Sequence, residues 1–313
     1  MMATTTSLIV FGNDKKGLKA RSRAKRRDPF ESALGLGGVP GIWGKILRFV
    51  IYAVVLFIFF GPIYILLVNA FSRVPSPANV SLIPTHFTIE NFAGALNRNV
   101  FTYLGNSFIV VGFGLVLQIL VSVSAAYALS RKKFPGMQLV MLLILSTMML
   151  PEEILAIPLS LVLADVPIIH VNLVGSLVGM IVPVGAWGMS ILVMTEFMKE
   201  VPLELEEAAR IDGAGELRTF WNVILPLTRP GLGVITIFGF NMIWDQYMLP
   251  LLVATDSAQY TLPLALRSLR SDETLGIGVV LAGAVLALLP SLIIFLCMQK
   301  QFMAGLNSGA VKG

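Results

Sequence analysis

Six long apolar segments constrain this chain more than any other feature, because each reaches or approaches the roughly 20 residues that a helix needs to cross a bilayer. Only 13% of the 313 residues are charged, against about 25% in an average soluble domain. Polar side chains are therefore too scarce to cover a water-soluble fold, and the sequence predicts an all-α polytopic membrane bundle of six transmembrane helices. We place the spans at Phe49–Ala70, Phe108–Ser130, Met137–Leu161, Asn172–Thr195, Gly231–Ala254 and Gly276–Met298.

The third span is the one whose course the sequence leaves open. Its apolar run Met137–Leu150 is short, and Pro151, Glu152 and Glu153 interrupt it. Either the span ends at this point, or it is a kinked helix whose acidic residues face a cavity.

A basic segment precedes the first span. Residues 1–48 are polar and contain glycine, and Lys15–Arg27 combines low hydrophobicity with high charge, which is typical of disordered chain. A basic arm can bind nucleic acid, but beside a membrane span it is better explained as an orientation signal, so we expect no nucleic-acid partner.

The distribution of Lys and Arg predicts the orientation, since these residues accumulate in cytoplasmic loops. With the N-terminus in the cytoplasm, nineteen of the 23 Lys and Arg residues lie on the cytoplasmic side. We therefore expect a cytoplasmic extension over residues 1–48, a membrane domain over 49–300 and a cytoplasmic tail over 301–313. The four remaining residues lie outside: Arg73, Arg98, Arg267 and Arg270.

The loop over residues 196–230, which we call the coupling loop, holds the longest polar stretch after the N-terminal extension. Acidic residues follow Pro202 at the expected start of a short helix, where the helix dipole favours negative charge. Gly213 and Gly215 are expected to end that helix, because glycine readily takes a positive φ. A second helix with Leu217, Phe220 or Trp221, and Ile224 on one face should follow. Exposed apolar groups rimmed by charge indicate a docking surface.

The coupling loop resembles the EAA signature of ABC importer permeases, which reads E-A-A, three residues, G, nine residues, I-x-L-P. Val223 stands at the position of the isoleucine. Other segments resemble the carbohydrate class of these permeases, the maltose-permease class, among them "YTLPLAL" at Tyr260–Leu266 and the ending "QFMAGLNSGAVKG". The resemblance runs from Arg48 to the C-terminus. The positions that carry the signature and its surroundings are Glu207, Ala208, Ala209, Asp212, Gly213, Ala214, Leu225 and Pro226.

The resemblance implies a permease subunit of an ATP-driven importer that works by alternating access on a sugar, oligosaccharide, polyol or sugar phosphate. In that family Glu207 would pair with a basic group on a separate ATPase, and Gly213 would form the turn between two coupling helices. The implied partners are a second, different permease subunit, a cytoplasmic ATPase dimer and an extracytoplasmic solute-binding protein, assembled in the lipid of the bacterial cytoplasmic (inner) membrane. ATP and Mg would be bound by the partner ATPase, since this chain has no phosphate-binding loop and needs no cofactor of its own.

The fifth span carries the residues that we expect to line the translocation path: Asn241, Trp244, Asp245 and Gln246. A charged carboxylate at mid-bilayer costs about 2.5–3.5 kcal/mol on insertion scales, so such residues face a bundle interior or a water-filled cavity. Asn241 and Asp245 share a helix face, and Trp244 could stack on a sugar ring. Other roles stay open: Trp244 as a membrane-interface residue, and Asp245 as a structural hydrogen-bond partner or as a residue just outside the membrane.

Two other functions compete with transport driven by a separate ATPase. A secondary transporter or channel would work without an ATPase, but no convincing inverted repeat supports it. An intramembrane enzyme could use Glu152, Glu153 and Asp245 as acid–base groups, but these lie on different spans and no catalytic motif accompanies them. The chain has two histidines, His86 and His170, both in expected loops. We therefore predict a non-catalytic subunit without a metal site.

Overall fold

Helices make up most of the part of the chain that the computed structural model describes. This part comprises residues 42–84, 86–270 and 276–310, with side chains up to residue 299. Within these ranges there is no β-strand, only two isolated bridges. The chain divides into two units, residues 1–63 and 64–313, and the boundary falls inside α3 (Ile42–Ala70). The predicted extension up to residue 41 and the last three residues of the predicted tail lie outside the described residues.

Among the described residues, four helical segments are long and apolar enough to cross a membrane, or up to six if each of two bent pairs is one span. The four are α3, α5 (Val100–Arg131), Leu177–Lys199 and Ile277–Gln299. One bent pair joins α6 (Met137–Met149) to α7 (Glu152–Ala164) at 111°, and the other joins Glu216–Leu227 to α13 (Arg229–Trp244) at 74°. The predicted all-α membrane bundle is confirmed.

Helix ends differ from the predicted spans because hydropathy locates apolar stretches rather than helix termini. α3 begins at Ile42, inside the predicted extension, and α16 runs from Ile277 to Ala310, into the predicted tail. The fourth predicted span consists of α8 (Leu177–Val184) and α9 (Gly188–Lys199). The fifth is interrupted after Trp244, and α14 (Met248–Val253) follows the break.

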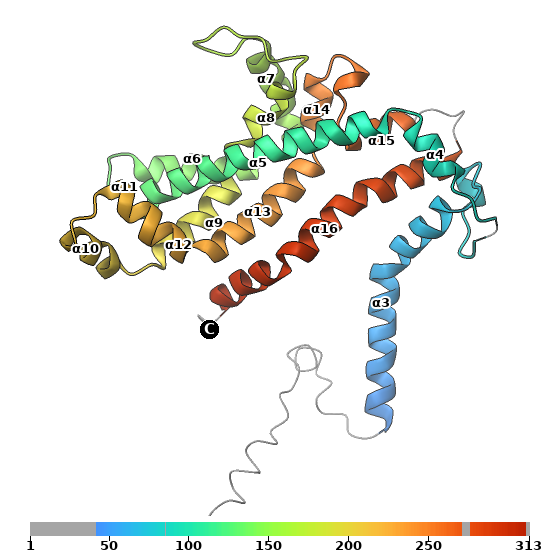
Figure 1. Ribbon diagram of the computed structural model, residues 1–313, viewed down its shortest axis with the longest axis horizontal. Helices are drawn as coiled ribbons and strands as arrows, with labels where there is room; N and C mark the ends of the chain where they lie inside the picture. The colour runs from blue at the N-terminus through green and yellow to red at the C-terminus, as the bar shows by residue number, and fades with distance from the viewer. Residues whose placement is uncertain (1–41, 85, 271–275, 311–313) are drawn as a thin grey trace, which may run out of the picture. The chain divides into compact units, whose positions relative to one another are not determined.

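Short helices connect the long ones. They are α4 (Glu90–Leu96), α10 (Leu203–Ile211), α11 (Glu216–Thr219), α12 (Leu225–Leu227) and α15 (Leu262–Arg270), together with the 3-10 turns η2 (Pro77–Asn79) and η4 (Ser257–Gln259) and the π-helical turn η3 (Phe220–Ile224). In the second unit, α10 and α11 lie at one end of α5, and α4 and α15 lie toward the other (Figure 1).

α5 is the helix on which the second unit is built, since it packs against α8, α9 and α13, and α13 in turn packs against α16. Toward one end of α5, Val110 and Val111 belong to an apolar core with Phe240 of α13. Toward the other end, a second core surrounds Met194 of α9. A Cβ at Gly114 would lie 2.9 Å from Val184 Cγ2, so a small residue there lets α5 and α8 approach closely.

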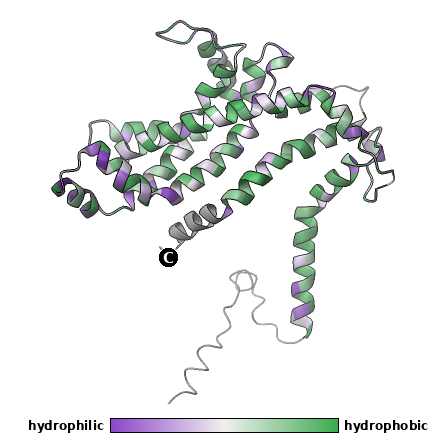
Figure 2. Cartoon of the chain, viewed as in Figure 1, coloured by the Kyte–Doolittle hydropathy of each residue, from purple (hydrophilic) through white to green (hydrophobic). Residues whose placement is uncertain are grey.

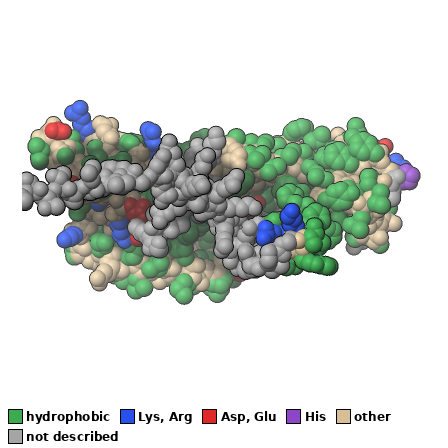
Figure 3. Space-filling model, turned by 90° about the horizontal axis from the view of Figure 1, so that it is seen from below, with side chains coloured by type: hydrophobic (Ala, Val, Ile, Leu, Met, Phe, Trp, Pro, Cys, Tyr) green, Lys and Arg blue, Asp and Glu red, His purple; other side chains and the backbone are tan. Residues whose placement is uncertain are grey.

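The exterior of these helices is apolar. Phe113 and Val116 of α5, for example, are 65% and 58% exposed. Green, hydrophobic residues run along the helices in Figure 2, and purple residues gather around α10. Hydrophobic side chains also cover much of the face drawn in Figure 3. Apolar surface of this extent fits contact with lipid and with other membrane subunits.

Candidate functional site

The two ends of α5 hold two different loops. Near its start, Asn106 Nδ2 donates hydrogen bonds to the carbonyl oxygens of Ala258 (2.8 Å) and Tyr260 (3.0 Å). At its end, Arg131 pairs with Glu206 of the coupling loop. The 32 residues of α5 span about 48 Å at 1.5 Å per residue, more than the hydrocarbon core of a bilayer. The coupling loop and the loop that follows α14 therefore lie at opposite ends of a membrane-crossing helix, as the predicted orientation requires; which end is cytoplasmic stays a prediction.

The coupling loop makes the predicted turn at Gly213, whose φ is +80°. Gly213 N donates to Arg210 O (3.0 Å) and Ala214 N donates to Ala209 O (2.9 Å). This pair of hydrogen bonds is the Schellman motif that closes a helix C-terminus and requires a left-handed residue, usually glycine. Gly215 differs from our expectation: its φ is −71°, and it is the N-cap of α11 rather than a part of the stop.

The apolar residues of the second coupling helix do not share one face. Phe220 and Ile224 are buried, and the Phe220 ring lies 5.0 Å from that of Tyr127 on α5. Leu217 and Trp221 are 75% and 56% exposed. The π-helical turn η3 changes the helical register over these residues, and such turns often occur at functional sites.

The predicted coupling residues lie mostly on the surface. The apolar side chains of Ile211, Leu217 and Trp221 are exposed in the same loop, and the charged side chains exposed there carry both signs, since Arg210 and Arg218 accompany the acidic residues. A surface of this composition suits a partner that offers apolar groups and charged side chains, among them a basic one for Glu207. Exposed members are Glu207, Ala208, Asp212 and Gly213, and half-buried ones are Ala209, Ala214, Leu225 and Pro226.

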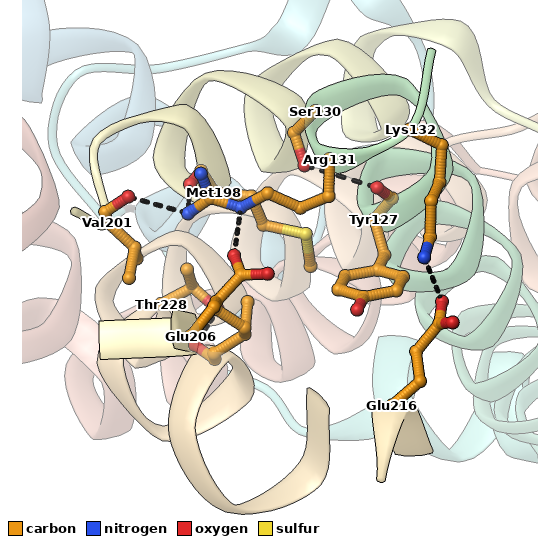
Figure 4. Close-up of polar contacts among 10 residues, drawn as sticks. Tyr127, Ser130, Arg131, Lys132, Met198, Val201, Glu206, Glu216 and Thr228 are labelled. Atoms are coloured by element: carbon orange, nitrogen blue, oxygen red, sulfur yellow. Dashed lines mark hydrogen bonds and ion pairs between the residues drawn. The ribbon is translucent and has the colours of Figure 1, made fainter. Parts of the chain in front are cut away.

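The buried acid of α10 is Glu206, which sequence reasoning missed in favour of Glu207. Arg131 Nε lies 2.7 Å from Glu206 Oε1, and the two side chains are 5% and 6% exposed. The angles of this ion pair fall outside hydrogen-bond geometry. Arg131 Nη2 also donates to Met198 O and Val201 O, both at 2.6 Å (Figure 4). The available signal was the pair of adjacent glutamates: neighbours on a helix point about 100° apart, so one of them turns toward the bundle.

A second ion pair joins the same region at the surface. Lys132 Nζ lies 2.5 Å from Glu216 Oε1 of α11, and the two side chains are 38% and 54% exposed (Figure 4). Surface pairs of this kind contribute little to stability, because water and salt screen the charges.

A cavity of about 520 Å³ lies where three helix interruptions meet, namely those between α6 and α7, α8 and α9, and α13 and α14. Glu152, Trp187 and Gln246, one from each interruption, line it. Non-helical backbone at membrane depth is tolerated where it lines a cavity, and interrupted helices commonly build transporter binding sites. The segment predicted as the third span is thus a pair of helices bent by 111°, with Glu152 at the cavity, whereas Glu153 is exposed and does not line it.

The four residues expected in the path fall in different places. Gln246 lines the cavity, and Asp245 is exposed at the C-cap of α13. Asn241 Nδ2 donates to Ile237 O (3.1 Å) within α13. Trp244 is only 2% exposed and lies in the apolar core rather than on the cavity surface. The path role of Asn241, Asp245 and Gln246 stays a prediction.

Residues 118–302 match the family described as "Binding-protein-dependent transport system inner membrane component". The matched region runs from the middle of α5 into α16, so it contains the coupling loop and the cavity residues.

Relatives with related descriptions cover most of the chain. The melibiose/raffinose/stachyose import permease protein MelC of Bacillus subtilis is 31% identical over 259 residues, which is 81% of this chain and 92% of that protein. The diacetylchitobiose uptake system permease protein DasC of Streptomyces coelicolor is 33% identical over 277 residues, 87% and 97% of the two chains. The sn-glycerol-3-phosphate transport system permease protein UgpE of Yersinia pestis is 35% identical over 203 residues, 64% and 70%.

The fold also resembles a chain in the crystal structure of a bacterial ABC transporter involved in the import of the acidic polysaccharide alginate. The TM-score is 0.71 at 22% identity, over 88% of this chain and 99% of that one. At this identity the likeness concerns the fold alone.

Proposed function

Since the chain belongs to the family of binding-protein-dependent transport system inner membrane components, we propose that it forms one half of the translocation path of an ATP-driven importer for a carbohydrate-type solute. The names of its relatives refer to oligosaccharides and to a polyol phosphate. The proposed solute is accordingly a sugar, oligosaccharide, polyol or sugar phosphate.

The structure of the coupling loop is the main support for this proposal. It presents exposed Glu207 and Ile211 at one end of α5, and a hydrogen-bonded turn at Gly213 fixes the angle between its two short helices. A loop whose turn is held by hydrogen bonds and whose apolar and acidic side chains are exposed can bind a partner and transmit its movement. We assign that partner as a cytoplasmic ATPase dimer that binds ATP and Mg, with both chain termini on the same cytoplasmic side.

We propose the remaining partners from the family to which the chain belongs, and two other surfaces suit them. The loop after α14 lies at the far end of α5, where an extracytoplasmic solute-binding protein would deliver solute. A second, different permease subunit would cover the apolar exterior and complete the path. This chain would then serve as a non-catalytic subunit of the complex.

The cavity gives the solute a place to stop during alternating access. Glu152 and Gln246 supply hydrogen-bonding groups, and Trp187 offers an aromatic surface on which a sugar ring can stack. The volume of about 520 Å³ is within the usual range of small-molecule sites.

Copurification and uptake with a charge-reversed variant test the proposal. The chain should copurify with an ATPase subunit, and proteoliposomes of the complex should import solute only with ATP. Glu207→Lys reverses an exposed charge on the docking surface, so it should abolish uptake while the amount of chain in the membrane stays the same; Glu207→Gln should have a smaller effect. Solute uptake by the chain alone, driven by an ion gradient, would favour a secondary transporter instead.

A further inference from the structure

We propose that Arg131 and Glu206 are positioning residues that fix α10 to the ends of α5 and α9, so that a push on the coupling loop moves these helices as one body. This inference deepens the proposed function and rests on it. Neither residue belongs to the docking surface, because both side chains are almost completely buried.

The contacts of Arg131 reach three consecutive parts of the chain. Its Nη2 donates to Met198 O in α9 and to Val201 O in the linker, and its Nε faces Glu206 Oε1 in α10. Arg131 is itself the last residue of α5. A single side chain thus joins the end of one membrane helix to the end of another and to the first coupling helix.

Arginine suits this position for a physical reason. Its guanidinium presents five N–H donors in a fixed plane, so it can bond two carbonyls and face a carboxylate at the same time. The carbonyls at the end of α9 are the negative end of a helix dipole, which favours a cation there. A lysine carries the same charge but cannot reproduce the planar arrangement.

Burial makes the contact persistent. Separating a buried ion pair would leave an uncompensated charge in a poorly solvated place, which is strongly unfavourable. The Arg131–Glu206 pair is therefore expected to remain closed while the helices move. The exposed Lys132–Glu216 pair can open into water at little cost.

The linker shows why such a contact is needed. Only Glu200, Val201 and Pro202 separate the last residue of α9 from the first of α10. Even with the φ of Pro202 fixed by its ring, this short linker keeps other backbone bonds that can rotate, so without a side-chain contact a force on α10 would turn α10 instead of moving α9. Arg131 bonds the middle residue of this linker and, beyond it, the helix that follows.

The test compares Arg131→Met with Lys132→Met in the complete complex in proteoliposomes. Lys132 is the matched control, since it is the neighbouring residue and its ion pair joins the same regions but is exposed. We expect Arg131→Met to raise the ATP hydrolysed per solute imported by about fivefold or more, the lower end of typical coupling effects. We expect Lys132→Met to leave this ratio unchanged. The ratio is a suitable readout because a loss of folded complex would lower both rates and leave it constant.

Hydrogen exchange of the α10 backbone provides a second measurement. Amides of residues 203–211 should exchange faster in Arg131→Met than in Lys132→Met, while those of α13 should not differ. If Arg131→Met fails to assemble, Glu206→Gln replaces it, because it retains volume and an acceptor oxygen while losing the charge. Glu206→Gln should also raise the ATP hydrolysed per solute imported and the exchange rate of the α10 amides, but by less than Arg131→Met.

The outcomes separate this inference from the proposed function. An unchanged ratio and unchanged α10 exchange, in Arg131→Met or in its substitute, would overturn the positioning role even though transport is coupled. If the wild-type complex shows no ATP-dependent uptake, the proposed function fails instead. In that case the exchange of α10 in the isolated chain decides whether Arg131 holds the helix.

Discussion

Trp244 Nε1 donates a 3.1 Å hydrogen bond to the carbonyl oxygen of Ala287, and this contact joins the end of α13 to α16. The Trp244 ring stacks on Phe240 with centroids 5.6 Å apart and planes at 9°, and its centroid lies 5.3 Å from that of Phe108 on α5. Trp244 is therefore placed to hold three helices together, and it is not among the residues that line the cavity.

Replacing Trp244 should mainly change stability. Trp244→Ala should lower the free energy of unfolding by about 3–5 kcal/mol, since it leaves a large void in the packing. Trp244→Phe should cost less, because it keeps an aromatic ring against Phe240 and loses the hydrogen bond to Ala287 and the volume of one ring. Unfolding of the purified chain in detergent measures both. A Trp244→Ala variant of unchanged stability but altered solute preference would contradict this assignment.

Two glycines of the coupling loop offer a matched comparison. An added Cβ would meet no atom within 4 Å at Gly213 or at Gly215, but only Gly213 has a positive φ, +80°. Gly213→Ala should therefore destabilise the turn by about 1–2 kcal/mol, and Gly215→Ala should be tolerated. Gly213→Pro, which fixes φ near −65°, should uncouple transport without loss of chain from the membrane.

Solute-stimulated ATP hydrolysis in the reconstituted complex measures the effect of these glycine variants. Normal stimulation in Gly213→Pro would show that the turn is not needed. If Gly213→Ala and Gly215→Ala lost the same share of solute-stimulated ATP hydrolysis, coupling would depend on the surface of the loop and not on the backbone conformation at Gly213.

The sequence allowed the turn at Gly213 and the apolar helices to be predicted, because each depends on a local property: backbone freedom in one case and hydropathy in the other. The burial of Trp244 between helices could not be predicted from the sequence. Helical spacing shows which residues share a face, but not whether that face meets a cavity or another helix. Glu206 and Glu207 illustrate the same limit, since only the position of Arg131, far away in the sequence, decides which of the two is buried.

The interruptions were visible in the sequence only in part. Pro151 and the two acids after it indicated a kink, and the structure places Glu152 at the cavity. Near Trp187 the available signal was Pro183, Gly185 and Gly188, since proline and glycine can interrupt a helix, but the apolar residues among them led the segment to be predicted as a continuous span. Three interruptions meet at one cavity through tertiary packing, which no local pattern records.

The two acids at the start of α7 should differ in function. Glu152 lines the cavity and Glu153 does not, although both stand in the first turn of the same helix. Glu152→Gln should change the concentration of solute that gives half-maximal uptake by about tenfold, the effect of losing one charged hydrogen bond. Glu153→Gln should leave it within about twofold of wild type, because a surface substitution away from the cavity changes little. Equal effects of both variants on uptake would contradict this.

The helix α15 should contact the solute-binding protein. Its Leu264 and Ala265 are buried, whereas Ser268 is exposed, so one face of the helix packs on the protein and the other lies at the surface. A crosslinker attached at Ser268→Cys should capture the binding protein in the solute-loaded, ATP-bound complex, and one attached at Ala265→Cys should not. The loop that follows α14 continues beyond α15 into residues 271–274, which lie outside the described residues. Absence of the crosslink in every state would remove this loop from the interface.

Cysteine labelling tests which residues near the end of α13 face the path. Cys297 is exposed, so the experiment requires a Cys297→Ser background. Gln246→Cys and Asp245→Cys should react with a water-soluble thiol reagent, since Gln246 lines the cavity and Asp245 is exposed beside it. Ile243→Cys should stay unlabelled, because Ile243 is 3% exposed in the core.

Asp245→Asn separates a role in the path from simple exposure. The variant keeps the size of the side chain and removes its charge, so assembly should be preserved while solute preference or uptake rate changes. If Asp245→Cys stays unlabelled in both inward- and outward-facing states and Asp245→Asn transports normally, Asp245 does not face the path. Labelling of Gln246→Cys alone would then place the path along the cavity formed by the helix interruptions and leave the C-cap of α13 outside it, because the two residues are adjacent and only Gln246 lines that cavity.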